Sequence, residues 1–172
     1  MRHPIQLILL FVMAALLVAG CGASEPAGNR TPASDPSPVQ KDEKKEMTIY
    51  VYYADAELSE KIVQERVIHY SNTQEKIEAA FAELQKDGED GALSLWKLIQ
   101  VHSLTVNNGD ITIDLSIPEE ARFGAPGEEF ALEAIRGTMF QFDDITSLNL
   151  LVDGEEPDSL MGHEKLDHPI RK

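Results

Sequence analysis

The sequence predicts an α+β domain, a small two-layer sandwich in which two helices pack on one face of a mixed β-sheet. Several short segments alternate apolar and polar residues, as half-buried strands do. Two longer segments repeat apolar residues at helical spacing, and an Asn-Gly turn joins two of the alternating segments. All of these lie from Met47 onward, in the order β-β-α-β-β-α-β, which is typical of such a sandwich.

The domain begins with two predicted strands. Residues 47–53 alternate in a stretch rich in β-branched and aromatic side chains, which favours a strand. Residues 62–70 fit two patterns, because Leu58 and Ile62 follow a helical spacing while the odd-numbered positions 63–69 follow a two-residue period. We favour a strand there too.

The first predicted helix follows. Asn72 can cap its N-terminus, with Glu75 three residues on, as in a capping box. Its apolar stripe has the spacing i, i+3, i+4, i+7 and consists of Ile77, Ala80, Phe81 and Leu84. The glycine-containing polar segment 87–90 then ends the helical pattern.

A hairpin, a second helix and a last strand complete the domain. Residues 99–106 and 110–116 flank Asn108-Gly109, which tolerates the positive φ of a tight turn, and Pro118 ends the returning strand. Residues 128–142 carry the second helical stripe. Residues 148–152 alternate again before an Asp-Gly turn, which predicts a final strand.

Residues 1–20 predict a secretion signal. Arg2 precedes the apolar run 5–17, and a helix of that length spans only about 21 Å at ~1.5 Å per residue, too short for the ~30 Å hydrocarbon core of a membrane. The ending Val-Ala-Gly-Cys resembles the bacterial lipobox. This resemblance implies cleavage before Cys21 and attachment of lipid to it, and Cys21 is the single cysteine of the chain.

Residues 21–46 predict a disordered linker that carries the lipidated Cys21. They are rich in Pro, Ser, Ala, Gly, Asp and Lys, and Val39 is their one large apolar residue, so they cannot form a core. The predicted domain occupies residues 47–172. The membrane is thus an expected partner through the lipid, with the protein on the extracytoplasmic face of the cell membrane.

Three segments of the domain resemble the sporulation and spore germination (GerMN) domain: 112–116 (Thr-Ile-Asp-Leu-Ser), 131–142 with its Gln-Phe ending, and 150–154 (Leu-Leu-Val-Asp-Gly). Leu-Met-Gly-His at 160–163 and His-Pro at 168–169 are similar to the ending of many members. The resemblance covers about 47–170 and implies an extracytoplasmic, often lipid-anchored domain of spore-forming bacteria without recognised catalytic residues. Related folds act in envelope assemblies, so envelope or sporulation proteins are the implied partners. One domain is present, whereas the germination lipoprotein that names the family is similar to two in tandem.

The residues themselves give no catalytic site, metal site or cofactor site. The segment 163–168 does not match the zinc-protease motif, because His163 and His168 are five apart rather than four and cannot share one helical face; a polar surface tail explains them more simply. A nucleophile elbow and a phosphate-binding loop are both missing. The formal net charge of −15 excludes nucleic acid as a partner. We therefore predict that the protein is not an enzyme.

Tyr50, Tyr52, Trp96 and His163 are the candidate interaction residues. Core packing also explains the aromatic ones, and exposure decides between the two roles. Two functions remain open, a protein-interaction module and a binder of cell-wall glycan or a small ligand. The first predicts a flat surface or a free sheet edge, and the second predicts a concave pocket with aromatic walls.

Overall fold

The computed structural model describes residues 44–172. The predicted signal, the lipidation site Cys21 and nearly all of the linker lie outside the described residues. Within 44–172, none of the helices is both long and apolar enough to cross a membrane. The folded part begins slightly before Met47, because the first strand already includes Lys45 and Glu46.

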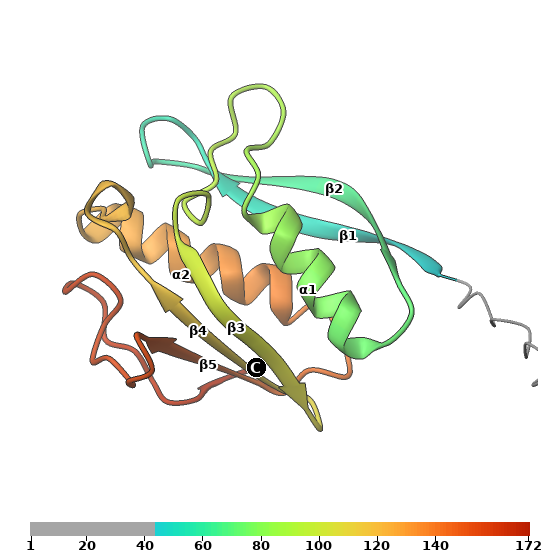
Figure 1. The fold of residues 1–172 in the computed structure, drawn as a ribbon. Coiled ribbons are helices and arrows are strands. Elements are labelled where there is room, and N and C mark those ends of the chain that lie inside the picture. The colour runs from blue at the N-terminus through green and yellow to red at the C-terminus, as the bar shows by residue number, and fades with distance from the viewer. Residues whose placement is uncertain (1–43) are drawn as a thin grey trace, which may run out of the picture. The chain divides into compact units, whose positions relative to one another are not determined.

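The described chain forms a strand pair, two α-helices and a four-stranded sheet (Figure 1). Strands β1 (Lys45–Ala54) and β2 (Lys61–Tyr70) pair antiparallel, so the strand favoured for 62–70 is confirmed. The Asp55 side chain accepts hydrogen bonds from the backbone of Ser59 and Glu60 and closes the turn between them. The remaining elements are α1 (Thr73–Leu84), β3 (Gln100–Asn107), β4 (Asp110–Ser116), the 3-10 turn η1 (Glu119–Ala121), α2 (Ala125–Met139), β5 (Ser147–Val152) and β6 (Ile170–Arg171).

The predicted α+β class is confirmed, and the arrangement of the strands differs in one respect from the expected single sheet. Strands β1 and β2 form a ribbon of their own, whereas β3, β4, β5 and β6 form the mixed sheet, in which β4 and β5 run parallel. Figure 1 shows α1 and α2 between the ribbon and this sheet. The helices thus cover one face of the mixed sheet, as expected, and the ribbon covers the helices.

Glutamine side chains explain why the two sheets do not merge. Gln141, just after α2, accepts from the Tyr50 N–H at 2.8 Å and donates to the Tyr50 carbonyl at 2.8 Å, on the free edge of β1. Gln74 of α1 makes the same two-sided contact on the free edge of β3, to the Leu104 carbonyl and the Val106 N–H. Each amide side chain satisfies backbone groups that a neighbouring strand would otherwise pair with.

The C-terminal segment is part of the core rather than the expected surface tail. Leu160, Leu166 and Ile170 are buried, and Ile170 pairs with Leu148 in the sheet. Fully buried Glu128 in the first turn of α2 accepts the backbone N–H groups of Met161 and His163 at 2.9 and 2.8 Å. A carboxylate at this end of a helix is favoured by the helix dipole, and here it also fixes the returning chain.

Candidate interaction surface

The structure places the four candidate interaction residues in different environments. Tyr50 is 50% exposed on β1. Tyr52 is partly buried, with its ring against Gly137 of α2 and the Lys61 amino group 5.9 Å from the ring centroid. The side chain of His163 is exposed, and its backbone is held by Glu128.

Trp96 is a core residue, which corrects its place among the interaction residues. It is 0% exposed, and its ring meets Phe81 edge-on at a centroid distance of 5.6 Å. Its indole Nε1 donates to the Ala131 carbonyl at 2.9 Å, which satisfies the one polar atom of the ring. A side chain in this position cannot contact a partner while the domain stays folded.

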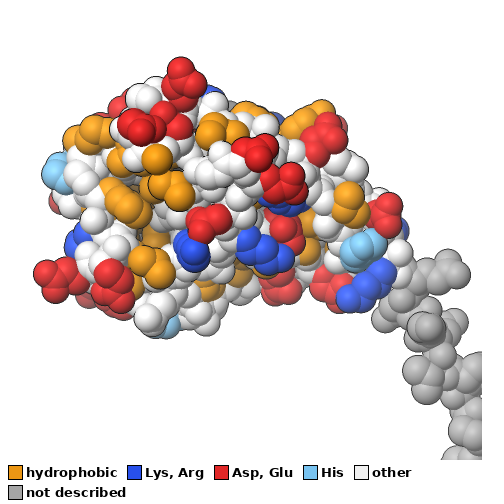
Figure 2. Space-filling view, turned by 90° about the horizontal axis from the view of Figure 1, so that it is seen from above, with side chains coloured by type: hydrophobic (Ala, Val, Ile, Leu, Met, Phe, Trp, Pro, Cys, Tyr) orange, Lys and Arg blue, Asp and Glu red, His pale blue; other side chains and the backbone are white. Residues whose placement is uncertain are grey.

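The outer face of the β1–β2 ribbon is the first part of a continuous candidate surface. Because residues opposite one another in an antiparallel pair point to the same side, the register puts the side chains of three central pairs together on this face. We call this the outer ribbon face: Thr48, Tyr50, Tyr52, Val63, Glu65 and Val67. Val63 and Val67 are 45% and 52% exposed, unusually open for valines on strands. Figure 2 looks onto the ribbon side, where hydrophobic side chains form small patches among acidic and basic ones.

The second part is a groove of about 380 Å³ beside the free edge of β1. We call it the β1-edge groove, and it is lined by Met47, Thr48, Lys76, Gln141, Phe142, Asp143 and Asp144. Thr48 belongs to both parts, so the groove adjoins the outer ribbon face. The contact with Gln141 shows that the backbone groups of Tyr50 point away from β2, and those of Thr48, two residues earlier, point the same way.

The charges in the groove do not balance. The Lys76 amino group lies 2.7 Å from both carboxylate oxygens of Asp144 and 4.9 Å from the centroid of the Phe142 ring. The hydrogen bond from Lys76 holds the pKa of Asp144 below its ordinary value, and Lys76 is itself nearly buried. Asp143 is exposed and has no cationic partner among residues 44–172, so one negative charge in the groove stays unpaired.

The Lys76–Asp144 pair predicts a pH-dependent stability. Because the folded-state pKa of Asp144 is lowered, the pair stabilises the fold above the ordinary value of 3.8, and this contribution is lost as the pH falls through the folded-state pKa. Asp144→Asn should lower the free energy of unfolding by about 1 kcal/mol at pH 7, after allowance for solvent screening, and by progressively less as the pH is lowered below 3.8. Urea denaturation at pH 7 and at a series of pH values below 3.8 measures this. Asp143→Asn is the control, and an equal effect of both changes at pH 7 would contradict the assignment.

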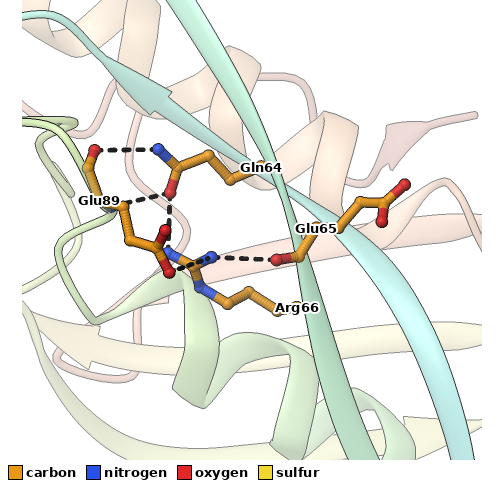
Figure 3. Close-up of polar contacts among 4 residues, drawn as sticks. All are labelled: Gln64, Glu65, Arg66 and Glu89. Atoms are coloured by element: carbon orange, nitrogen blue, oxygen red, sulfur yellow. Dashed lines mark hydrogen bonds and ion pairs between the residues drawn. The ribbon is translucent and has the colours of Figure 1, made fainter.

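A second polar cluster, shown in Figure 3, is structural. The Gln64 side chain pairs with both backbone groups of Glu89, accepting and donating at 2.9 Å, while Arg66 donates to the Gln64 side-chain oxygen at 2.8 Å. A Cβ on Gly88 would lie 2.6 Å from the same oxygen, so the loop approaches β2 closely because residue 88 is glycine. Burial raises the pKa of Tyr53 beside Arg66. The cluster fastens the loop after α1 to the ribbon.

The described histidines and acidic residues do not form a metal site. Within 44–172, no three His, Cys, Asp or Glu side chains are grouped to hold an ion. Both ring nitrogens of His168 lie against protein oxygens, at 3.0 Å from the Asn149 side chain and 2.6 Å from the Pro157 carbonyl. His168 therefore fixes the C-terminal segment, and it does not converge with exposed His163 on a ligand.

Comparison with known proteins decides the family. The model of the Germane family matches residues 50–158, well over half of the chain. The description of this family is "sporulation and spore germination". The chain belongs to the Germane family. The resemblance drawn from the sequence is thereby confirmed. No curated protein matches the chain.

Solved structures agree with the family on the fold. A candidate lipoprotein from Clostridium perfringens is 25% identical over 75% of this chain and 88% of its own, with a TM-score of 0.51. The first GerMN domain of the sporulation protein GerM from Bacillus subtilis is 16% identical over 73% of this chain and 98% of its own, with a TM-score of 0.53. The tandem GerMN domains of GerM are 22% identical, with a TM-score of 0.50; the match covers 75% of this chain and 45% of theirs.

In this Germane domain, the residues that carry the family resemblance have structural roles. Gln141 braces the edge of β1, and the Phe142 ring lies under the Lys76 amino group. Asp114 accepts the Gly154 N–H at 2.8 Å, and Gly154 adopts a φ of +84°, which favours glycine. The motif residues therefore build the domain and the wall of the groove.

Proposed function

We propose that this protein is a lipid-anchored, non-enzymatic interaction module on the extracytoplasmic face of the cell membrane, serving an assembly of sporulation or spore germination. The family match over residues 50–158 carries the proposal, because the family is described by sporulation and germination and not by a reaction. The Cys21 sequence pattern and the structural similarity to a candidate lipoprotein support the anchor. The exposed valines and tyrosine of the outer ribbon face suit a surface that contacts protein.

The structure favours protein over cell-wall glycan as the ligand. Ligand pockets are lined predominantly by hydrophobic and aromatic side chains, on which a sugar ring could stack if they were exposed. The aromatic residue that lines the β1-edge groove, Phe142, is only 4% exposed, and Lys76 covers one face of its ring. The most exposed aromatic ring of the surface, Tyr50, stands on the flat ribbon.

In vivo cross-linking of the tagged full-length protein, in growing and in sporulating cells, tests the proposal. Mass spectrometry should identify envelope membrane proteins that are captured in sporulating cells and are absent from growing ones. Capture of wall material in both conditions would favour the glycan binder. Capture of nothing in either condition would also contradict an interaction module.

Changing Cys21 to Ser should abolish lipidation. A serine hydroxyl does not replace the thiol that receives the diacylglyceryl group, and without that lipid residues 1–20 should remain attached. Metabolic labelling with a clickable palmitate analogue should drop to background, and intact mass should show the longer precursor. Ser24→Ala, a change of one small residue just beyond the cleavage site, should label and mature normally. Equal labelling of the Cys21 variant would disprove the anchor.

A further inference from the structure

We infer that the β1-edge groove receives an extended, basic segment of a partner protein, which pairs with the free edge of β1 as an added strand. The inference rests on the proposed function, because it assigns a surface and a partner chemistry to the interaction module. Strand addition is a general mode of peptide recognition in which backbone hydrogen bonds give affinity and side-chain pockets give specificity.

The edge of β1 is open at Thr48 and is occupied at Tyr50, by Gln141, and at Ala54, by Leu93. At Tyr50 the Gln141 side chain occupies both outward backbone groups. At Thr48 the outward N–H and carbonyl have no partner among residues 44–172, and Thr48 is exposed. An incoming strand can therefore pair with residues 45–48 and must end at Gln141, which fixes its register.

The charges of the groove select a basic occupant. Lys76 is held by Asp144 and nearly buried, so it cannot neutralise a second acid. Asp143 is exposed and unpaired within the described part, and Glu46 stands 70% exposed on the same strand edge region, 3.8 Å from His69. A Lys or Arg side chain on the added strand would meet Asp143. An acidic side chain at that position would be repelled by Asp143, because exposed Lys45 points to the face of the strand opposite Glu46 and Lys76 is already paired.

The same charges disfavour a second copy of this chain as the occupant. Pairing β1 with β1 of another copy would bring exposed Glu46 and Asp143 of each copy near those of the other. Like charges brought together across an interface repel each other. The whole chain carries a formal net charge of −15, which adds general repulsion between copies.

A photo-reactive amino acid at position 48 of the full-length lipoprotein, in sporulating cells, tests the inference. The expected product joins position 48 to a Lys- or Arg-containing segment of an envelope protein, identified by peptide mass spectrometry. Asp143→Lys should reduce this product about tenfold, because it places like charges together. Replacing the contacting basic residue of the captured segment by Asp should restore it. The photo-reactive residue at exposed Glu119 is the positional control.

Strand pairing has its own test in Thr48→Pro and Thr48→Val, each combined with a photo-reactive residue at position 47, which lines the groove and leaves Asp143 in place. Proline removes the outward N–H without breaking the ladder to β2, because proline is accepted on edge strands where the N–H faces solvent. Only the proline variant should lose the product, while urea denaturation of both variants should show a folded domain. Equal products from both variants would overturn strand pairing.

The remaining outcomes separate this inference from the proposed function. A product that joins position 48 to another copy of the chain, to residues 22–43 of the same chain or to an acidic segment would overturn the inference. Products from positions 63 and 67 of the outer ribbon face, with none from position 48, would overturn it and leave the interaction module intact. An absence of products from all three positions would overturn both.

Discussion

Replacing Trp96 by Ala should lower the free energy of unfolding by about 4 kcal/mol, the usual cost of truncating a large aromatic side chain in a core. The ring is 0% exposed, meets Phe81 edge-on and donates from Nε1 to Ala131. Its removal leaves a cavity beside Phe81 of α1 and Ala131 of α2, and it removes the hydrogen bond from Nε1 to the Ala131 carbonyl. Urea denaturation of the soluble chain from residue 22 onward measures the effect.

Tyr50→Ala is the matched control, because the Tyr50 ring is 50% exposed while its backbone bonds to Gln141 do not depend on the side chain. We expect a loss of no more than about 0.5 kcal/mol, typical of surface changes. The effects on partner capture should be reversed. Tyr50→Ala should reduce the amount of captured partner, whereas Trp96→Phe, which keeps an aromatic ring in the core, should leave it unchanged. If the Trp96→Phe variant folded normally but no longer captured the partner, Trp96 would have a role in partner binding and the assignment to the core alone would be wrong.

The case of Trp96 shows where sequence analysis stops. Local patterns predicted the local structure well: Asn72 caps α1 through a 2.9 Å bond from the Glu75 N–H, and Asn108-Gly109 forms the expected turn with positive φ at both residues. The spacing around Trp96 has no clear period, since it lies in a loop between α1 and β3. Its burial depends on α2, more than thirty residues away along the chain.

The separation of the strands into two sheets also depends on contacts between residues that are distant in the sequence, so it could not be predicted. Alternation identifies strands but does not say which strand pairs with which. The decision depends on polar side chains, Gln141 on Tyr50 and Gln74 on β3, that satisfy backbone groups 91 and about 30 positions away in the sequence. From the sequence alone, a glutamine on a helix surface is predicted to be an ordinary solvated residue. Its role becomes visible only when the strand edge that it bonds is known. The β1-edge groove is also built from three such distant segments, so only its individual residues could have been named.

Changing Glu128 to Gln should lower the free energy of unfolding by about 3 kcal/mol. The carboxylate is fully buried and accepts from two backbone N–H groups, one on each oxygen. A glutamine of the same shape has one acceptor oxygen, so its amide nitrogen would face a second donor. An unsatisfied buried group costs about 1–3 kcal/mol, and loss of the charge at the helix N-terminus adds up to about 1 kcal/mol.

The damage should also be local, because these bonds hold the segment that contains Met161 and His163 against α2. Amide hydrogen exchange should accelerate most in residues 159–171, before global unfolding begins. Glu129→Gln supplies the matched control, since Glu129 is the exposed neighbour on the same helical turn, and it should change stability by no more than about 0.5 kcal/mol. Equal stability of the two variants, or uniform exchange along the chain in the Glu128 variant, would show that the C-terminal segment is held by its buried apolar residues Leu160, Leu166 and Ile170 instead. In that case the carboxylate would be a helix-end charge without a role in fastening the chain.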